Sequence, residues 1–189
     1  MALALRSINL NDSSLVYLDQ QLDRARAGQS SAIAVLIRAH QRSVYSLALR
    51  MLGARELAED LAQDVFMQMS DHLKQIESNQ HLVFWLRKVT THKAIDQLRH
   101  RARIEWTALD ENQAISDPTE HRDPLLQRHL SALLQNLTPD ARAVVLLRYQ
   151  EDLDPTDIAR TLDMPVNTVK SHLKRSLESL RERLEELSP

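Results

Sequence analysis

The sequence predicts an all-α protein made of two small helical domains joined by a flexible linker, with a helix-turn-helix in the C-terminal domain. Apolar residues recur at helical spacing along almost the whole chain, and no stretch shows the alternation of a half-buried strand. One internal segment, IEWTALDENQAISDPTEHRDP from Ile104 onward, loses this periodicity and gathers Asp, Asn, Ser and Pro. We therefore expect a domain over residues 1–103, a linker over 104–123 and a second domain over 124–189.

Start and stop signals divide the N-terminal domain into four helices. Polar residues at 12–14 can cap the first helix, and Gly28 ends it in the left-handed position that glycine favours. Ser30 or Ser31 begins the second helix and Gly53 ends it. The expected helices cover about 12–27, 30–52, 54–73 and 81–103.

The C-terminal domain repeats one kind of start signal. Thr138-Pro139 and Asp154-Pro155 each place a capping side chain before a proline at the first helical position. The second of these starts a short helix that is separated from the last helix by the tight turn Asp163-Met164-Pro165, which gives helix-turn-helix dimensions. The expected helices cover about 124–137, 139–149, 156–162 and 166–187.

Composition excludes several classes of function. The 189 residues carry a net charge of −2, so any binding to nucleic acid must rest on local patches. The chain has no cysteine, and its two glycines cannot build the phosphate loops of common nucleotide enzymes. The eight histidines show no metal-ligand spacing, and no nucleophile triad can be nominated. We expect no metal, no cofactor and no enzymatic activity.

Localisation follows from hydropathy. No apolar run approaches the roughly 18 residues of a membrane span, and the first residues lack the layout of a signal peptide. We expect a cytoplasmic protein with no membrane insertion.

The fourth helix carries a basic strip. Six cations lie between Phe84 and Trp106, against two anions. On an ideal helical wheel, five residues share a strip about 60° wide. This pattern suits contact with a nucleic-acid backbone and stacking on separated bases, although Trp85 is equally expected to pack on a neighbouring helix. The basic strip consists of Trp85, Lys88, His92, Arg99 and Arg103.

The third helix has the opposite charge. Its polar side is acidic, which suits either plain solvation or docking of a basic protein. The acidic face consists of Glu59, Asp60, Gln63 and Asp64.

The last helix changes sign along its length. Three cations and no anion lie between Val166 and Leu177, whereas four anions and two cations follow up to Leu187. An apolar stripe runs from Val169 to Leu187, and we expect it to serve the fold along its whole length. The opposite side carries donors suited to phosphates and to base edges in a major groove. We expect DNA contact to stop at about Arg175. The recognition face consists of Asn167, Thr168, Lys170, Ser171, Lys174 and Arg175.

Both halves resemble the bacterial RNA polymerase sigma factors of the sigma-70 type, specifically the extracytoplasmic-function (ECF) group. AEDLAQDVFMQM (58–69) and FWLRKVTTHKAIDQLRHRAR (84–103) look like the polymerase-binding and promoter-reading helices of sigma domain 2. The stretch 137–184 looks like sigma domain 4. Order, spacing and two-domain layout agree.

The resemblance implies a role for each surface. The acidic face would bind the β′ subunit of core RNA polymerase, whose β subunit is also an expected partner. The basic strip, with the loop Ile76–His81 before it, would open and read the minus-ten element of promoter DNA. The recognition face would enter the major groove of the minus-thirty-five element, and the linker would run through polymerase toward the RNA path. An anti-sigma factor is the expected regulator.

The chain departs from the family pattern where glycine is common. Asp152 and Asp163 are the residue type best able to adopt the left-handed conformation in glycine's place, so both turns should be kept. Asp163 should also bring an anion close to the minus-thirty-five DNA. Asn167 and His92 are further departures, at a helix start and in the basic strip respectively.

Three other functions are weighed against a sigma factor. A sigma mimic that sequesters an anti-sigma factor needs no DNA contacts, so the retained cations count against it. A stand-alone helix-turn-helix regulator leaves the acidic face and the long linker without a role. An enzyme would need a site that no residue constellation indicates.

Overall fold

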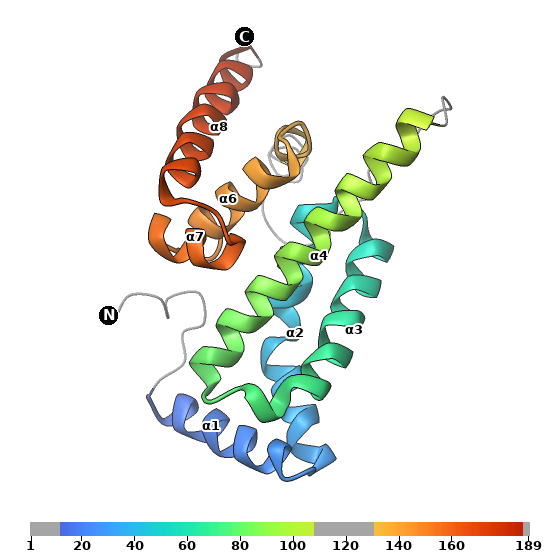
Figure 1. Cartoon of the computed structure of the whole chain (residues 1–189), viewed down its shortest axis with the longest axis vertical. Coiled ribbons are helices and arrows are strands. Elements are labelled where there is room, and N and C mark those ends of the chain that lie inside the picture. Colours follow the sequence, from blue (N-terminus) through green and yellow to red (C-terminus); the bar gives the residue numbers. More distant parts are fainter. Residues whose placement is uncertain (1–11, 108–130, 187–189) are drawn as a thin grey trace.

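The computed structural model describes residues 12–107 and 131–186, and every regular element in these stretches is helical. Figure 1 shows two groups of helices. The N-terminal unit contains α1 (Asp12–Arg26), α2 (Ser30–Leu52), α3 (Arg55–His72), the 3₁₀ turn η1 (Leu73–Gln75) and α4 (Asn79–Thr107). The C-terminal unit contains a helical turn at residues 131–135, followed by α6 (Pro139–Tyr149), α7 (Pro155–Leu162) and α8 (Val166–Glu186). The all-α prediction is confirmed.

The predicted caps of the C-terminal unit are present. The Thr138 side chain accepts a hydrogen bond from the Ala141 amide, and Asp154 Oδ1 accepts from the amides of Thr156 and Asp157 at 2.7 and 2.9 Å. These side chains satisfy amides that the first helical turn leaves without partners. Gly53 ends α2 at φ +72°, as predicted.

Helix α4 is longer than the periodicity predicted. It begins at Asn79, two residues before the expected start, because the Ser78 hydroxyl accepts the amide of His81 and caps the first turn. It continues to Thr107, so the first four residues of the expected linker are helical. The expected loop Ile76–His81 is therefore reduced to Ile76–Ser78. The rest of the linker and the first eleven residues lie outside the described residues, and the domain boundaries stay predictions.

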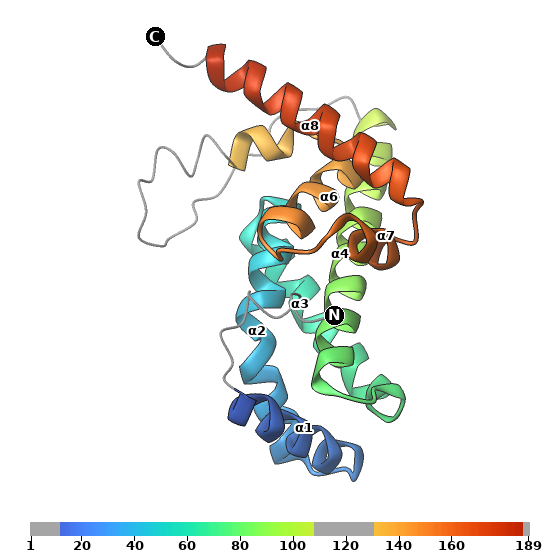
Figure 2. The same ribbon diagram turned by 90° about the vertical axis from the view of Figure 1, so that its left-hand side faces the viewer.

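The apolar stripe of α8 is buried only in its first half. Val169 is fully buried, whereas Leu177 is 43% and Leu184 44% exposed. The expectation that the whole stripe serves the fold is therefore wrong. The helix outgrows the small unit that it packs on, so its second half projects beyond α6 and α7 (Figure 2).

The two units pack against each other. Helix α6 contacts α2 and α4, and α7 contacts α4 (Figure 2). The buried apolar residues of both units form one contiguous cluster, from Leu18 to Val169. This packing places the C-terminal unit against α4, the helix that carries the basic strip.

Candidate nucleic-acid interface

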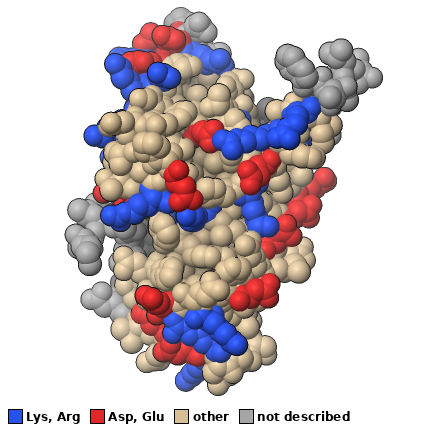
Figure 3. Space-filling model, viewed as in Figure 1, with Lys and Arg blue, Asp and Glu red and all other residues tan. Residues whose placement is uncertain are grey.

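The acidic face lies on the solvent side of α3. All four of its residues are exposed, while Leu61, Val65 and Met69 on the other side are fully buried. Two of its carboxylates have cationic neighbours: Arg55 Nε lies 2.8 Å from Glu59, and Lys93 Nζ lies 3.7 Å from Asp64. Figure 3 shows Asp and Glu side chains along the edge of the molecule that α3 forms. The face is open to a protein partner.

The recognition face of α8 is equally open. All six residues predicted to contact DNA are exposed. The Ser171 hydroxyl donates to the carbonyl of Asn167, and Lys174 Nζ approaches Glu178 at 3.9 Å. This last pair marks the point along α8 where the charge changes sign. The buried Val169 anchors the opposite side of the helix, so these polar side chains point away from the unit.

The basic strip of α4 is mostly occupied. At one edge, the half-buried Trp85 packs on His72 of α3, with ring centroids 5.4 Å apart. Arg103 lies farther along α4 and is exposed. The other three residues contact the C-terminal unit.

These three contacts are polar and specific. Lys88 Nζ donates to Asp163 Oδ1 at 2.8 Å. His92 Nε2 donates to the carbonyl of Thr161 at 3.0 Å and lies 3.6 Å from Asp163 Oδ2. Arg99 Nη2 donates to both carboxylate oxygens of Asp140, at 2.9 and 2.8 Å. Carboxylates and a carbonyl of the C-terminal unit thus occupy the donors that were predicted to meet DNA.

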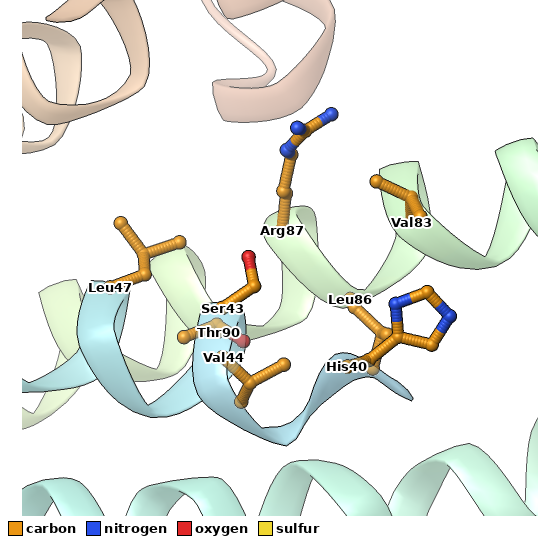
Figure 4. A pocket seen from close by; sticks show the side chains of 8 residues that line it. All are labelled: His40, Ser43, Val44, Leu47, Val83, Leu86, Arg87 and Thr90. Atoms are coloured by element: carbon orange, nitrogen blue, oxygen red, sulfur yellow. The ribbon is translucent and has the colours of Figure 1, made fainter. Parts of the chain in front are cut away.

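A buried ion pair lies beside these contacts. Arg87 Nε donates to Glu151 Oε2 at 2.7 Å, and the two side chains are only 9% and 3% exposed. Figure 4 shows that the Arg87 side chain points from α4 toward the C-terminal unit and away from α2. No local signal in the sequence marks this pair, because Arg87 is one of many cations on α4 and Glu151 belongs to a turn.

Arg142 of α6 makes a second buried junction. Its guanidinium donates to the carbonyls of Leu134 (3.0 Å) and Gln135 (2.7 Å) within its own unit, and to the carbonyl of Met51 at the end of α2. Gln135 Nε2 also donates to the Arg50 carbonyl at 3.3 Å. Burial lowers the pKa of Arg142 to about 10, so it remains charged at neutral pH. It therefore acts as a cap for carbonyls at the ends of two helical segments.

Asp152 and Asp163, which stand where the family pattern often has glycine, both adopt the predicted conformation. Asp152 and Asp163 have φ values of +53° and +51°, which confirms the left-handed turns. The expectation that Asp163 faces minus-thirty-five DNA does not describe this arrangement, because its carboxylate is paired with α4. The hydrogen bond from Lys88 holds the pKa of Asp163 below its ordinary value, against the smaller opposing effect of desolvation.

A small cavity lies between α2 and α4. Its volume is about 10 Å³, enough for about one water molecule. It is lined in part by His40, Val83 and Thr90 (Figure 4). Across residues 12–107 and 131–186, no three His, Asp or Glu side chains are grouped to hold a metal ion. In the same ranges, no helix is both long and apolar enough to cross a membrane.

Comparison with known proteins identifies both units. Residues 36–104 match the family model of sigma-70 region 2, and residues 127–180 match that of sigma-70 region 4. The RNA polymerase sigma factor CarQ of Myxococcus xanthus is 31% identical over 168 residues, covering 88% of this chain and 97% of its own length. The ECF RNA polymerase sigma factor SigW of Bacillus subtilis is 27% identical over 183 residues, covering 90% and 98%.

Solved structures share the fold. A complex of the sigma factor RpoE with the anti-sigma factor NepR from Bartonella quintana matches with a TM-score of 0.66 and 22% identity, over 79% of this chain and 94% of that one. CnrH in complex with the cytosolic domain of CnrY matches with a TM-score of 0.65 and 20% identity, over 89% and 98%. The chain belongs to the ECF group of the sigma-70 family, the RNA polymerase sigma factors that direct transcription initiation at specific promoters.

Proposed function

We propose that the three surfaces divide the work of this sigma factor. The acidic face binds core RNA polymerase, the basic strip opens and reads the minus-ten element, and the recognition face reads the minus-thirty-five element. One observation carries the proposal: the exposed acidic face and the strip lie within the region 2 match, and the exposed cationic recognition face lies within the region 4 match.

Charge supports this division. Four acidic or polar side chains on one side of α3 suit a basic protein surface and would repel DNA. The cations at the start of α8 suit phosphates, and helix-turn-helix proteins insert the N-terminal part of their second helix into the major groove. The glutamates farther along α8 would lie clear of the duplex.

The protein acts without catalysis of its own and works in the cytoplasm, where core polymerase is found. Its regulator is an anti-sigma factor, a partner class supported by the similar fold of RpoE, which was solved in complex with the anti-sigma factor NepR.

The test is run-off transcription with purified core polymerase and fragments of the host genome. We expect transcripts to start at discrete sites only when the protein is added. A variant with Glu59→Lys and Asp60→Lys should lose binding to core polymerase, while Glu182→Lys with Glu185→Lys on α8 is the matched control and should not. Absence of core binding by the unmodified protein, with no anti-sigma factor present, would favour a sigma mimic.

A further inference from the structure

The short connection before α4 is held from outside by α1. Only Ile76, Glu77 and Ser78 separate η1 from α4, and we call this segment the α4 loop. Helix α1 lies below the loop in Figure 1 and contacts both η1 and α4. Because the α4 loop leads into the helix that carries the basic strip, the contacts that fix this loop also fix the polar groups at that end of the strip.

Two side chains of α1 bind the backbone at the two ends of the α4 loop. Arg26 Nη2 donates to the carbonyl of Ile76, where the loop begins. Asp19 Oδ1 accepts the amide of Asn79, the first residue of α4, at 2.6 Å. Asp19 and Arg26 are seven residues apart, which is close to two helical turns, so both side chains leave the same face of α1. One face of α1 therefore holds both ends of the loop.

The Asn79 side chain gives the loop a third fixed point. Asn79 is 1% exposed, and its Oδ1 accepts a hydrogen bond from His40 Nε2 of α2 at 3.0 Å. The Asn79 amide that Asp19 accepts is one of those that the first turn of a helix leaves without a partner, and a carboxylate suits the positive end of the helix dipole. Ile76, at the other end of the loop, is equally buried. Both ends of the loop are thus anchored in the N-terminal unit.

The middle of the α4 loop is open to solvent and ordered by local hydrogen bonds. The Glu77 amide donates to His81 Nδ1 at 3.3 Å, and the Ser78 hydroxyl accepts the His81 amide at 3.1 Å. Glu77 and Gln80 are exposed, while Ser78 and His81 are half-buried. Anchored ends with polar groups exposed between them suit a loop that contacts a ligand in one fixed conformation.

We propose that Asp19 and Arg26 are positioning residues for promoter recognition, which hold the α4 loop in the conformation that meets the minus-ten element. The inference rests on the proposed function of the basic strip and deepens it, because it assigns part of the base selectivity to α1. Ordering a loop opposes binding, so a loop that is ordered in advance discriminates between bases more strongly than one that adapts to each of them.

Substitutions at Asp19 separate a positioning role from an effect of charge. Asp19→Ala removes both the charge and the acceptor of the Asn79 amide, whereas Asp19→Asn keeps an acceptor oxygen and removes only the charge. Asp23→Ala is the matched control, because it removes the same charge one turn farther along α1. The Asp23 carboxylate pairs with Nη1 of Arg26, while the bond to Ile76 comes from Nη2.

The first readout is hydrogen exchange of the Asn79 amide, measured by NMR on the free protein. Loss of the charged acceptor in Asp19→Ala should speed this exchange about tenfold or more. Asp19→Asn and Asp23→Ala should each change the rate by less than about threefold. An exchange rate in Asp19→Ala equal to that of the unmodified protein would show that Asp19 does not hold the loop, and would overturn the proposal.

The second readout is base selectivity, measured with the holoenzyme that the protein forms with core polymerase. The probe is a pool of single-stranded DNA with about ten randomised positions, which excludes the duplex-binding recognition face, and the bound fraction is sequenced. We expect Asp19→Ala to lower the enrichment of the preferred base about tenfold at one or two adjacent positions and to leave the others unchanged. Asp19→Asn should keep the full enrichment, a rescue that an effect of charge alone would not give.

The outcomes distinguish this proposal from the proposed function. Full enrichment by Asp19→Ala, or an equal loss at every position, would overturn the positioning role. Absence of any enrichment by the unmodified holoenzyme would instead contradict the reading of the minus-ten element, whatever the exchange rates show. Arg26→Ala releases the other end of the loop and should repeat the loss at the same positions, whereas Arg24→Ala, at an exposed arginine of the same helix, should not.

Discussion

The two cationic surfaces of this sigma factor differ in what covers them. The recognition face on α8 is open, while three of the five residues of the basic strip on α4 are held by the C-terminal unit. Both surfaces look alike in the sequence, as cations at helical spacing. The difference shows that the charge pattern of a helix does not reveal whether its cations are open to a partner or engaged within the chain.

The largest expected effect is that of Glu151→Gln, which removes the anion of the buried ion pair between the two units. The substitution leaves the Arg87 guanidinium buried without its anion, which typically destabilises a folded protein by about 3–5 kcal/mol. Separation of the two units would avoid this loss, because water could then reach Arg87. We expect opening, measured as a larger radius of gyration by small-angle X-ray scattering. Glu185→Gln on α8 also removes a partner of an arginine, but that pair is 82% and 71% exposed, so its loss should cost only about 0.3–0.5 kcal/mol and leave the radius unchanged. A compact Glu151→Gln protein would mean that the buried pair does not hold the units together.

The salt dependence of DNA binding measures how far DNA contact extends along α8. Lys174→Ala with Arg175→Ala should weaken duplex binding and lower the slope of log K against log salt by about 1.8, since each phosphate contact contributes about 0.9. Arg181→Ala with Arg183→Ala removes as much charge farther along the same helix and should leave the slope nearly unchanged. An equal slope for both double variants would place the end of DNA contact beyond Arg175.

The two glycines offer a comparison between strain and packing. Both have positive φ, so Gly28→Ala and Gly53→Ala should each lose about 1–2 kcal/mol of unfolding free energy. A methyl group at Gly28 meets nothing within 4 Å, whereas at Gly53 it would lie 2.7 Å from Gln135 Nε2 of the C-terminal unit. We expect the Gly53 variant to lose more stability in urea unfolding than the Gly28 variant. Identical losses would mean that Gln135 moves aside without cost.

The smallest effect concerns pH. Burial lowers the pKa of His40, and the nearby charge of Arg87 acts in the same direction, while the hydrogen bond with Asn79 opposes them. Below its ordinary pKa of 6.5 the unfolded chain binds a proton that the folded protein does not. Stability should therefore fall as pH drops below 6.5, by at most about 1.4 kcal/mol per pH unit, until the folded pKa is reached. His40→Gln should flatten this slope in urea unfolding between about pH 5 and 7, and an unchanged slope would assign the dependence to other groups.

Local features of the fold were predictable from the sequence, because they depend on neighbouring residues. Thr138 and Asp154 mark helix starts, Gly53 marks a helix end, and the left-handed turns predicted at Asp152 and Asp163 are present. The start of α4 was missed by two residues because Ser78 was not recognised as its cap.

The packing between the units was not predictable in this way. Arg87 and Glu151 are 64 residues apart, and neither breaks a local pattern. Arg142 lies in α6, where every residue from Ala141 to Leu147 is buried, but a single sequence does not distinguish a buried arginine from a solvated one. The candidate surfaces were located by their residue types, but whether each surface is open depends on contacts that no local periodicity encodes.

The contacts between the two units differ in kind at the two ends of the interface. At the Arg142 end, the guanidinium keeps its bonds to Leu134 and Gln135 when the units part, and the carbonyls of Met51 and Arg50 are left to water. At the Glu151 end, the two members of a buried ion pair lose each other at once. A break at the Glu151 end therefore separates two charges, whereas a break at the Arg142 end separates only neutral carbonyls from their donors.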